Sequence, residues 1–348
     1  MDRTTYQFDR IEALRAAPLR RVGGGSGERA PPPNAPNPRI GVIYNPRSHR
    51  NRGQDLECTQ RLGITVAQPE SREQIAEALA DLDRQGVDFL IINGGDGTVR
   101  DVLTMGQGVF GDNWPALAVL PKGKTNALTV DLGVPTDWSL SDAVAAWSDG
   151  RRVRRRPLAI TAQGRDEPAV MGFFLGAGAF TIGTRAGQDA HALGFFGSLA
   201  VGATAAWGVL QALLGSNRNQ WRRGSEMAIS RLSDGSALAH SQHGDPGRRS
   251  IILASTLRHM PMGLKLFAPD SSGIKLVAMD KPLRRLLLSF PAILYGWRPA
   301  WLERAGFHQT DGEGFAMRFA EPFILDGEAF DPGQYRVEQG PDLTFVTA

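Results

Sequence analysis

The sequence predicts two folded domains, an α/β domain built on a parallel sheet followed by an antiparallel β-sandwich. Between residues 39 and 147, apolar strand patterns alternate with helical patterns, which is typical of a parallel sheet that binds its ligand at the carboxyl ends of its strands. After residue 156, short apolar runs are separated by turn residues, which indicates antiparallel strands. Residues 1–38 are polar and rich in glycine and proline, so we expect a flexible extension there.

These patterns divide the chain into the extension over residues 1–38, the α/β domain over 39–156 and the β-sandwich over 157–348, whose last residues could return to the first domain. In the α/β domain, strands are expected at 39–44, 64–67, 87–92 and 116–120, and helices at 55–62, 71–85, 99–104, up to 130, and 139–147. Ser71 stands at an N-cap position, which marks the start of its helix. In the β-sandwich, strands are expected at 157–161, 169–174, 227–231, 251–256, 264–267, 274–278, 315–319, 323–325 and 335–337.

The composition limits the class of protein. The chain has 348 residues, of which 42% are hydrophobic and 22% charged, as in soluble globular proteins. Its net charge of +3 is too small to indicate nucleic acid binding, although it suits contact with phosphates and anionic surfaces. A single cysteine, Cys58, excludes an intramolecular disulfide and favours a reducing, cytoplasmic compartment. Residues 193–215 carry no charge, but they are rich in Ala and Gly, so we expect an amphipathic or buried helix rather than a membrane span.

The strongest chemical signal is the loop Gly94-Gly95-Asp96-Gly97-Thr98, which joins a buried strand to a helix. Glycines let the backbone approach phosphate oxygens and present its N–H groups, and the positive end of the helix dipole adds to the attraction. Asp96 would repel a phosphate unless a cation lay between them, so Mg²⁺ is the expected mediator. Taken alone, the loop could also be a glycine-rich turn that only reverses the chain.

A second loop, Pro121-Lys122-Gly123-Lys124-Thr125-Asn126, also joins a strand to a helix. Its Gly123-Lys124-Thr125 ending matches that of a Walker A loop, but the first glycine that such a loop needs is replaced by Ala118 inside the strand. A true Walker A loop is therefore not expected. A phosphate-facing loop that uses Lys122 and Lys124 remains open, as does a solvated basic turn.

Two further polar segments stand at strand ends. Asn45-Pro46-Arg47-Ser48 follows the first strand, where Asn and Ser side chains either cap the next helix or contact a nucleotide. Asp326-Gly327-Glu328 follows the apolar run 323–325, and its two carboxylates suit activation of a hydroxyl group or metal binding. The similar triplet Asp311-Gly312-Glu313 shows that this pattern also arises in ordinary hairpins.

In this order, the four segments resemble the diacylglycerol kinase catalytic family, which includes bacterial diacylglycerol kinases, sphingosine kinases and ceramide kinases and is distantly related to NAD kinases. The family shows NPxSG, GGDGT, PxGTxN and a late DGE, which correspond here to Asn45–His49, Gly94–Thr98, Pro121–Asn126 and Asp326–Glu328. Residues 174–185 also look like the glycine-rich strand end with which the family's β domain faces its cleft. The resemblance covers the chain from Arg39 onward.

The resemblance implies an NAD kinase-like α/β domain, with ATP and Mg²⁺ in a cleft beside the β-sandwich, and phosphorylation of the hydroxyl of diacylglycerol, ceramide or a sphingoid base. Carried over, the nucleotide contacts are Asn45, Pro46, Ser48, Gly94, Gly95, Asp96, Gly97, Thr98, Gly123, Lys124 and Asn126. Asp326 is then the general base, supported by Glu328. Asp96 is the metal ligand and a second candidate for the base.

Two positions depart from the family pattern, because His49 replaces a glycine and Lys124 replaces a threonine. Lys124 could place a point charge on the γ-phosphate. Both changes could instead mark an altered nucleotide preference or a loss of activity. Two alternatives therefore stay open: an NAD kinase-like enzyme with a soluble acceptor, and a catalytically silent regulator that binds a nucleotide or a lipid.

A lipid acceptor would require contact with a membrane. Residues 193–214 and 281–304 are apolar and aromatic, and Arg284, Arg285, Arg298 and Arg304 bracket the second stretch. This pattern suits an interfacial segment at anionic lipid, with an ordinary core helix as the alternative. We expect a cytoplasmic protein that associates peripherally with the inner face of the cytoplasmic membrane and binds no nucleic acid, and we leave a homodimer open.

Overall fold

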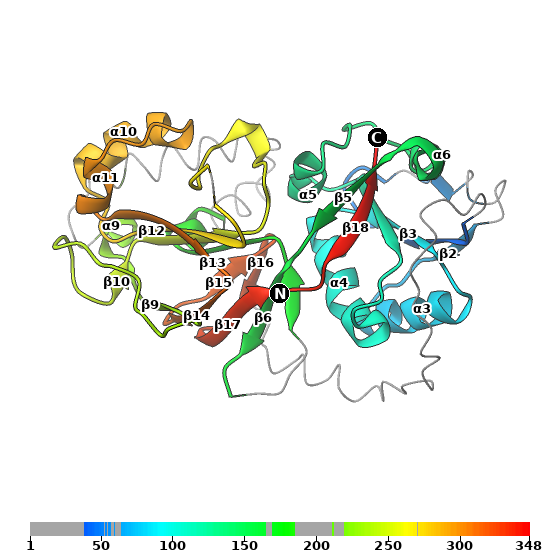
Figure 1. Cartoon of the computed structure of the whole chain (residues 1–348), viewed down its shortest axis with the longest axis horizontal. Coiled ribbons are helices and arrows are strands. Elements are labelled where there is room, and N and C mark those ends of the chain that lie inside the picture. The colour runs from blue at the N-terminus through cyan, green and yellow to red at the C-terminus, as the bar shows by residue number, and fades with distance from the viewer. Residues whose placement is uncertain are drawn as a thin grey trace.

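The computed structural model describes residues 38–51, 53, 55–56, 59, 64–164, 169–184, 211, 219–269 and 271–348. Within them the chain forms two lobes, a first lobe around one six-stranded sheet and a second lobe around two more (Figure 1). This arrangement confirms the predicted fold class. The extension up to residue 37, most of the helix expected at 55–62 and nearly all of 193–215 lie outside the described residues.

The sheet of the first lobe has the strand order β2-β1-β3-β4-β18-β5. Its parallel part consists of β1 (Ile40–Tyr44), β2 (Thr65–Ala67), β3 (Phe89–Gly94), β4 (Ala116–Pro121) and β18 (Leu343–Thr347). The helices of this lobe are α3 (Arg72–Arg84), α4 (Asp96–Phe110), α5 (Ala127–Asp131) and α6 (Leu140–Asp149). Every residue of β3 and β4 is buried, as expected for central strands covered on both faces.

Local sequence signals explain where two of these four helices begin. The side chains of Ser71 and Ser139 cap α3 and α6 by accepting the N–H groups of Gln74 and Asp142. By contrast, α4 is much longer than the helix predicted at 99–104. The helix continues through Gly106. A Cβ at this position would lie 2.4 Å from the ring of Trp114, so a glycine is needed here for packing. That glycine is a packing position rather than a stop signal.

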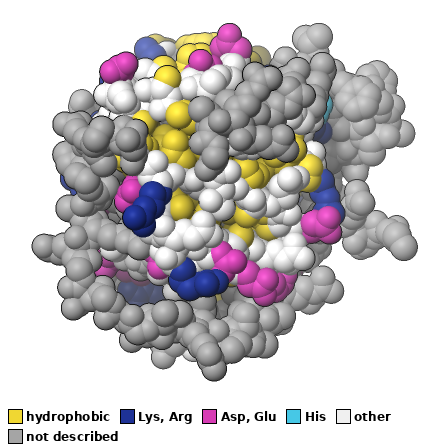
Figure 2. All heavy atoms as spheres, turned by 90° about the vertical axis from the view of Figure 1, so that its right-hand side faces the viewer, with side chains coloured by type: hydrophobic (Ala, Val, Ile, Leu, Met, Phe, Trp, Pro, Cys, Tyr) yellow, Lys and Arg dark blue, Asp and Glu magenta, His cyan; other side chains and the backbone are white. Residues whose placement is uncertain are grey.

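The last strand of the chain, β18 (Leu343–Thr347), lies in the first sheet, between β4 and the antiparallel β5 (Arg151–Arg155) (Figure 1). The second lobe is therefore inserted between two neighbouring strands of the first sheet. The two connecting segments are joined where the N–H of Gly340 donates to the carbonyl of Pro157 at 2.8 Å. At the end of the first lobe, side chains of both charge signs lie beside apolar ones (Figure 2).

The second lobe is a sandwich of two antiparallel sheets, with orders β10-β9-β14-β17-β6-β7 and β13-β12-β11-β8-β15-β16. Its strands are β6 (Leu158–Ala162), β7 (Val170–Gly172), β8 (Phe174–Gly178), β9 (Ser225–Arg231), β10 (Arg248–Arg249), β11 (Ile251–Ser255), β12 (Ile274–Met279), β13 (Phe307–Gly312), β14 (Gly314–Phe319), β15 (Phe323–Leu325), β16 (Glu328–Phe330) and β17 (Gly333–Gln339). A core that includes Leu175, Ile252, Phe315 and Phe323 fills the space between the sheets.

Short helices cover the outer face of the second of these sheets. Here α10 (Arg284–Leu294) and α11 (Trp301–Arg304) bury Leu286, Ile293 and Leu302 against strands β11 to β13. Two smaller elements are α9 (Gln220–Arg223) and the 3₁₀ turn η2 (Pro261–Gly263). Among the described residues, none of the helices combines the length and the apolar character needed to cross a bilayer.

Several expected strands need correction. The prediction at 264–267 is wrong, because this segment is a loop that packs Leu266 and Phe267 into the core beneath α10. The run predicted as one strand at 169–174 is two strands, β7 and β8, interrupted at Phe173. The strands β10, β13, β16 and β18 were not predicted, because their short or polar runs lack a clear alternation.

Candidate active site

Three of the four predicted loops meet at the carboxyl ends of β1, β3 and β4. The side-chain amide of Asn45 donates to Oγ1 of Thr98 at 2.8 Å, which joins the first two loops. The backbone of Gly95 approaches that of Gly123 so closely that a Cβ on Gly95 would lie 2.6 Å from the Cα of Gly123. Because the three strands are parallel neighbours, their loops form one continuous surface.

The N-terminus of α4 is available for an anion. Its N-cap residue is Gly95, and no side chain caps the helix. The N–H groups in the first turn of a helix have no partner within the helix, and the helix dipole favours negative charge there. This 15-residue helix therefore presents the kind of backbone site that binds phosphate.

The N-terminus of α5 is already occupied by Asp96, the first residue of α4. The two carboxylate oxygens of Asp96 accept the N–H groups of Ala127 at 3.0 Å and Leu128 at 3.3 Å. Asn126 precedes α5 in the left-handed conformation, with φ of 53°, and its Oδ1 accepts the N–H of Gly123 at 2.7 Å. The loop around Gly123 is therefore shaped by Asp96 and Asn126, which leaves α4 as the open helix end.

The two lysines of this loop have different surroundings. Lys122 forms a 2.8 Å ion pair with Asp55, whose carboxylate also accepts a hydrogen bond from the side chain of Asn93. Lys122 is thus held inside the first lobe. Lys124 is exposed, and within the described part of the chain it has no ion pair. Of the two, Lys124 is the cation that could reach a phosphate.

The other predicted contacts in the first lobe differ in exposure and packing. Pro46 and His49 are exposed, and Ser48 lies in a turn in which its N–H donates to the carbonyl of Asn45 at 3.1 Å. Gly94 is required by packing, because a Cβ there would lie 2.4 Å from that of Thr98. Gly97 has open space around it, with no atom closer than 3.8 Å to such a Cβ.

The second lobe contributes Asp326, which directly follows β15. Its carboxylate accepts the N–H groups of Phe173 and Phe174, both at 2.9 Å, at the interruption between β7 and β8. Asp326 has a positive φ of 46°, a conformation that Asp adopts more readily than most residues. Gly172 makes room for it, because a Cβ there would lie 2.7 Å from the carboxylate. This arrangement fixes the carboxylate of Asp326.

Burial, together with the negative charge of nearby Asp96, raises the pKa of Asp326 to about 7. The hydrogen bonds from the N–H groups of Phe173 and Phe174 and the charge of Arg100 act in the opposite direction. Burial likewise raises the pKa of Asp96, against the backbone hydrogen bonds that it accepts. The two carboxyl groups, one from each lobe, are therefore close enough to influence each other's ionisation.

Glu328 has a different position from the one its triplet suggested. Its carboxylate forms ion pairs with Arg100 of α4 and, at 3.1 Å, with Arg72 of α3. Arg100 is only 4% exposed, and it also donates to the carbonyl of Leu325 at 3.3 Å. Glu328 and Arg100 therefore hold the Asp326 turn against the first lobe.

The sequence did not single out the residues that join the lobes at this site. Arg72, Arg100 and Asp101 form a charged cluster with Glu328, and the hydroxyl of Thr104 accepts the N–H of Met171 at 3.0 Å. Arg100 and Asp101 directly follow the glycine loop and Val99, and an arginine inside an otherwise apolar helical segment was the available signal. Its partner in the second lobe could not be inferred from local pattern.

A divalent cation fits the donors at this site. Asp96 supplies carboxylate oxygens of the type that Mg²⁺ prefers, and burial raises its pKa, so a cation beside it would favour its charged form. The described residues contain no cluster of three or more His, Cys, Asp or Glu side chains placed to hold a metal. Further ligands would have to be phosphate oxygens and water, as is usual for Mg²⁺ in kinases.

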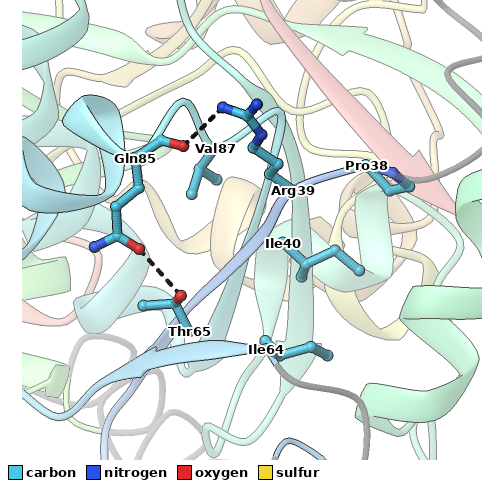
Figure 3. A pocket seen from close by; sticks show the side chains of 7 residues that line it. All are labelled: Pro38, Arg39, Ile40, Ile64, Thr65, Gln85 and Val87. Carbon is cyan, nitrogen blue, oxygen red and sulfur yellow. Dashed lines mark hydrogen bonds between the residues drawn. The ribbon is translucent and has the colours of Figure 1, made fainter.

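A pocket elsewhere in the first lobe is separate from this site. It is lined by Pro38, Arg39, Ile40, Ile64, Thr65, Gln85 and Val87 (Figure 3). These residues lie around the amino ends of β1, β2 and β3, whereas the predicted loops follow carboxyl ends. Figure 3 shows two hydrogen bonds within the pocket wall: the guanidinium of Arg39 donates to the backbone carbonyl of Gln85, and the hydroxyl of Thr65 donates to the side-chain oxygen of Gln85.

Comparison with known proteins agrees with the geometry. Residues 39–156 match the family model of the diacylglycerol kinase catalytic domain. This match confirms the family resemblance over residues 39–156, which contain three of the four motifs, and it supports a lipid kinase-type family for the first lobe. No curated protein matches the chain.

Solved structures support the fold of both lobes. A diacylglycerol kinase from Bacillus anthracis str. Sterne matches with a TM-score of 0.58 at 13% identity, over 89% of this chain and 97% of that chain. Two further structures from the same bacterium match with TM-scores of 0.60 and 0.59 at 14% and 13% identity, again over 89% of this chain and over 96% and 97% of theirs. At these identities the comparison concerns the fold.

The close approach of two loops predicts opposite effects for two neighbouring glycines. Gly95→Ala would push a methyl group into the backbone of Gly123, so we expect the free energy of unfolding to fall by about 1–3 kcal/mol. Gly97→Ala is the matched control, because it has open space within α4 and should leave stability unchanged or raise it by up to about 1 kcal/mol. Urea unfolding measures both. Equal losses would show that the loops are not packed in this way.

The buried ion pair predicts a second stability difference. Glu328→Gln leaves the buried charge of Arg100 with Asp101 as its remaining carboxylate partner, so we expect a loss of about 3 kcal/mol. Glu338→Gln removes an exposed ion pair with Arg336 and should cost less than about 1 kcal/mol. Thermal and urea unfolding of the two variants provide the comparison, and a loss of similar size in both would contradict the role assigned to Glu328.

Proposed function

We propose that this protein is an ATP- and Mg²⁺-dependent lipid kinase that transfers the γ-phosphate of ATP to the hydroxyl of a membrane lipid such as diacylglycerol, ceramide or a sphingoid base. The observation that carries the proposal is the pairing of two features across the lobes. The open N-terminus of α4 suits the phosphates of a nucleotide, and the carboxyl group of Asp326, with a pKa of about 7, lies near the same helix end.

In this proposal the first lobe binds the nucleotide. The N–H groups at the start of α4, within Gly94–Thr98, bind the phosphates, and Asn45 positions Thr98. Pro46 and Ser48 lie on the same rim, while Gly123 and Asn126 form the opposite wall. Lys124 is exposed on that wall and would neutralise charge on the γ-phosphate.

Asp96 would hold Mg²⁺ together with phosphate oxygens and water, which leaves Asp326 free to act on the acceptor. The bound ion would neutralise charge on the transferring phosphoryl group. Asp96 has a further role that does not depend on the metal, because its carboxylate fixes the loop around Asn126 through the N-terminus of α5.

Asp326 would act as the general base. As the lipid oxygen attacks the γ-phosphorus, its proton passes to the carboxylate of Asp326, and the bond from the γ-phosphorus to the oxygen that bridges it to ADP breaks. A carboxylate with a pKa near 7 is a stronger base than an ordinary one and is still substantially ionised at neutral pH. Glu328 would support this step indirectly, by holding the turn through Arg100.

We place this enzyme in the cytoplasm, at the inner face of the cytoplasmic membrane, because its acceptor would be a lipid. The exposed apolar side chains of α10 favour a lipid over a soluble acceptor such as NAD. A silent nucleotide- or lipid-binding regulator would share the fold but would have no need for a base with a raised pKa.

A direct assay tests the proposed activity. Purified protein with labelled ATP and Mg²⁺ is offered diacylglycerol, ceramide, sphingosine and NAD, and we expect a phosphorylated lipid. Asp326→Ala should lower the rate by a factor of about 10² to 10⁴. Asp311→Ala, which alters the similar triplet at the β13–β14 turn, is the control and should retain activity. A product from NAD alone, or no product at all, would overturn the proposed lipid kinase activity. If the Asp326→Ala variant stays active, Asp326 is not the general base and Asp96 becomes the candidate.

The raised pKa predicts how the rate depends on pH. Only ionised Asp326 can accept a proton, so kcat/KM should rise with pH through about 7 and level off above it. One unit below that pKa, about a tenth of the sites are active. The residual activity of Asp326→Asn over the same range controls for titration of ATP itself. If that variant keeps the same acidic limb, Asp326 is not the group responsible.

A further inference from the structure

Large apolar side chains are exposed mainly in one part of the second lobe. Among the described residues, the exposed large apolar side chains are those of Val130, Met262, Leu288, Tyr295 and Trp297. Four of these five lie between residues 262 and 297, and Met262 and Leu288 are 77% and 72% exposed. A concentration of this kind on a soluble protein usually marks an interaction surface.

The helix α10 exposes apolar side chains on its outer face beyond its first turn. Leu286, Leu287 and Ile293 are buried on the side that faces the sheet. On the opposite side, Leu288 and Tyr295 are separated by seven residues, which is two helical turns, so they lie on one exposed face. A surface helix of a globular protein normally carries polar residues on that face. The exposed side chains of Leu288 and Tyr295 therefore do not contribute to the core of the second lobe.

Positive charge surrounds this face. Residues 281–304 contain five basic residues and one acidic residue, Glu303. Arg284 and Arg285 are exposed in the first turn of α10, where the helix dipole disfavours positive charge. Burial, together with the charge of Arg284, lowers the pKa of Arg222 in the adjacent α9, so a further basic group lies close by. Such a concentration of positive charge suits a negatively charged partner.

The loop that carries Met262 is attached to the far end of α10. The N–H of Lys265 donates to the carbonyl of Leu294 at 2.7 Å, and Arg298 donates to the carbonyl of Lys265. Met262 itself has a positive φ of 60°, which is unusual for a residue with a long side chain. Its turn, η2, contacts α5 of the first lobe, so Met262 is not counted with the exposed side chains of α10.

The segment after α10 is fixed in place as well. The rings of Trp297 and Trp301 meet edge to face with centroids 6.0 Å apart, and the guanidinium of Arg285 lies 3.9 Å from the centroid of Trp301. Cation–π contact of this kind orders both groups. The exposed residues of α10 and of the segment after it thus belong to a preformed surface, which we call the α10 surface and define as Arg284, Arg285, Leu288, Tyr295 and Trp297.

We infer that the α10 surface docks on an anionic lipid bilayer. Its apolar side chains would enter the interface between headgroups and acyl chains, while Arg284 and Arg285 would bind lipid phosphates. The combination of exposed aromatic, aliphatic and basic side chains fits this partner. The end of the first lobe shown in Figure 2 instead carries Asp and Glu as well as Lys and Arg beside its apolar side chains. In one respect this inference rests on the proposed kinase function: docking would present the cleft between the lobes to an acceptor lipid in the membrane.

A vesicle-binding experiment with the full chain tests the surface. Phosphatidylcholine vesicles with and without phosphatidylglycerol are sedimented with the protein, and we expect binding only to the anionic vesicles, weakened by salt. The double variant Leu288→Gln, Tyr295→Gln should bind at least about tenfold more weakly. Val130→Gln, which changes the exposed apolar residue outside the surface, should bind like the wild type. Because all three positions are exposed, unchanged melting temperatures confirm that the variants are folded.

The single cysteine allows a second, site-specific measurement. In a Cys58→Ser background, Leu288→Cys and Val130→Cys are each labelled with an environment-sensitive fluorophore. Anionic vesicles should shift the emission of the label at position 288 to shorter wavelength and leave the label at position 130 unchanged. Equal shifts at both positions, or none at either, would overturn the docking surface.

The outcomes also separate this inference from the proposed kinase function. If the double variant binds vesicles like the wild type, or changes only a monomer–dimer equilibrium measured by light scattering, the α10 surface is not a membrane contact. If the surface behaves as expected but no lipid is phosphorylated, the kinase proposal fails and the surface stands. If both hold, the double variant should lose activity on diacylglycerol in anionic vesicles but keep it on a short-chain, water-soluble diacylglycerol.

Discussion

The candidate site depends on the buried ion pair between Arg100 and Glu328. A charge that is removed from water is stable only with a well-placed partner, and Arg100 is almost completely buried. The same guanidinium also binds the carbonyl of Leu325, the residue directly before Asp326. The position of the candidate base in one lobe is therefore determined by a helix of the other lobe, and neither lobe contains the whole site.

That helix, α4, uses one face for all of these tasks. Asp96, Arg100 and Thr104 follow one another at four-residue spacing, so they lie along one side of the helix. Asp96 caps α5, Arg100 binds the turn of Asp326, and Thr104 accepts the N–H of Met171 in β7. The glycine loop proposed to bind phosphate and the junction between the lobes are thus set by a single rigid element, which would favour precise placement of a phosphate relative to a base.

Most of the first lobe could be predicted from the sequence, because buried parallel strands and capped helices leave strong local patterns, as at Ser71 and in the run 87–92. The motif residues also lie where their strand ends implied. Their contacts could not be predicted: Lys122 is paired with Asp55, and Glu328 with Arg100, and both pairs join residues far apart in the sequence. The second lobe was less predictable, because short strands such as β16 are defined by neighbours rather than by their own residues.

The position of β18 has a consequence for how the chain is made. During synthesis, β1 to β5 emerge first, but β4 and β5 are joined only by a strand that emerges after the whole second lobe. Until then β4 has an unpaired edge, and exposed edges of this kind are where nascent sheets pair wrongly. The sheet of the first lobe can therefore be completed only after the whole second lobe has been synthesised.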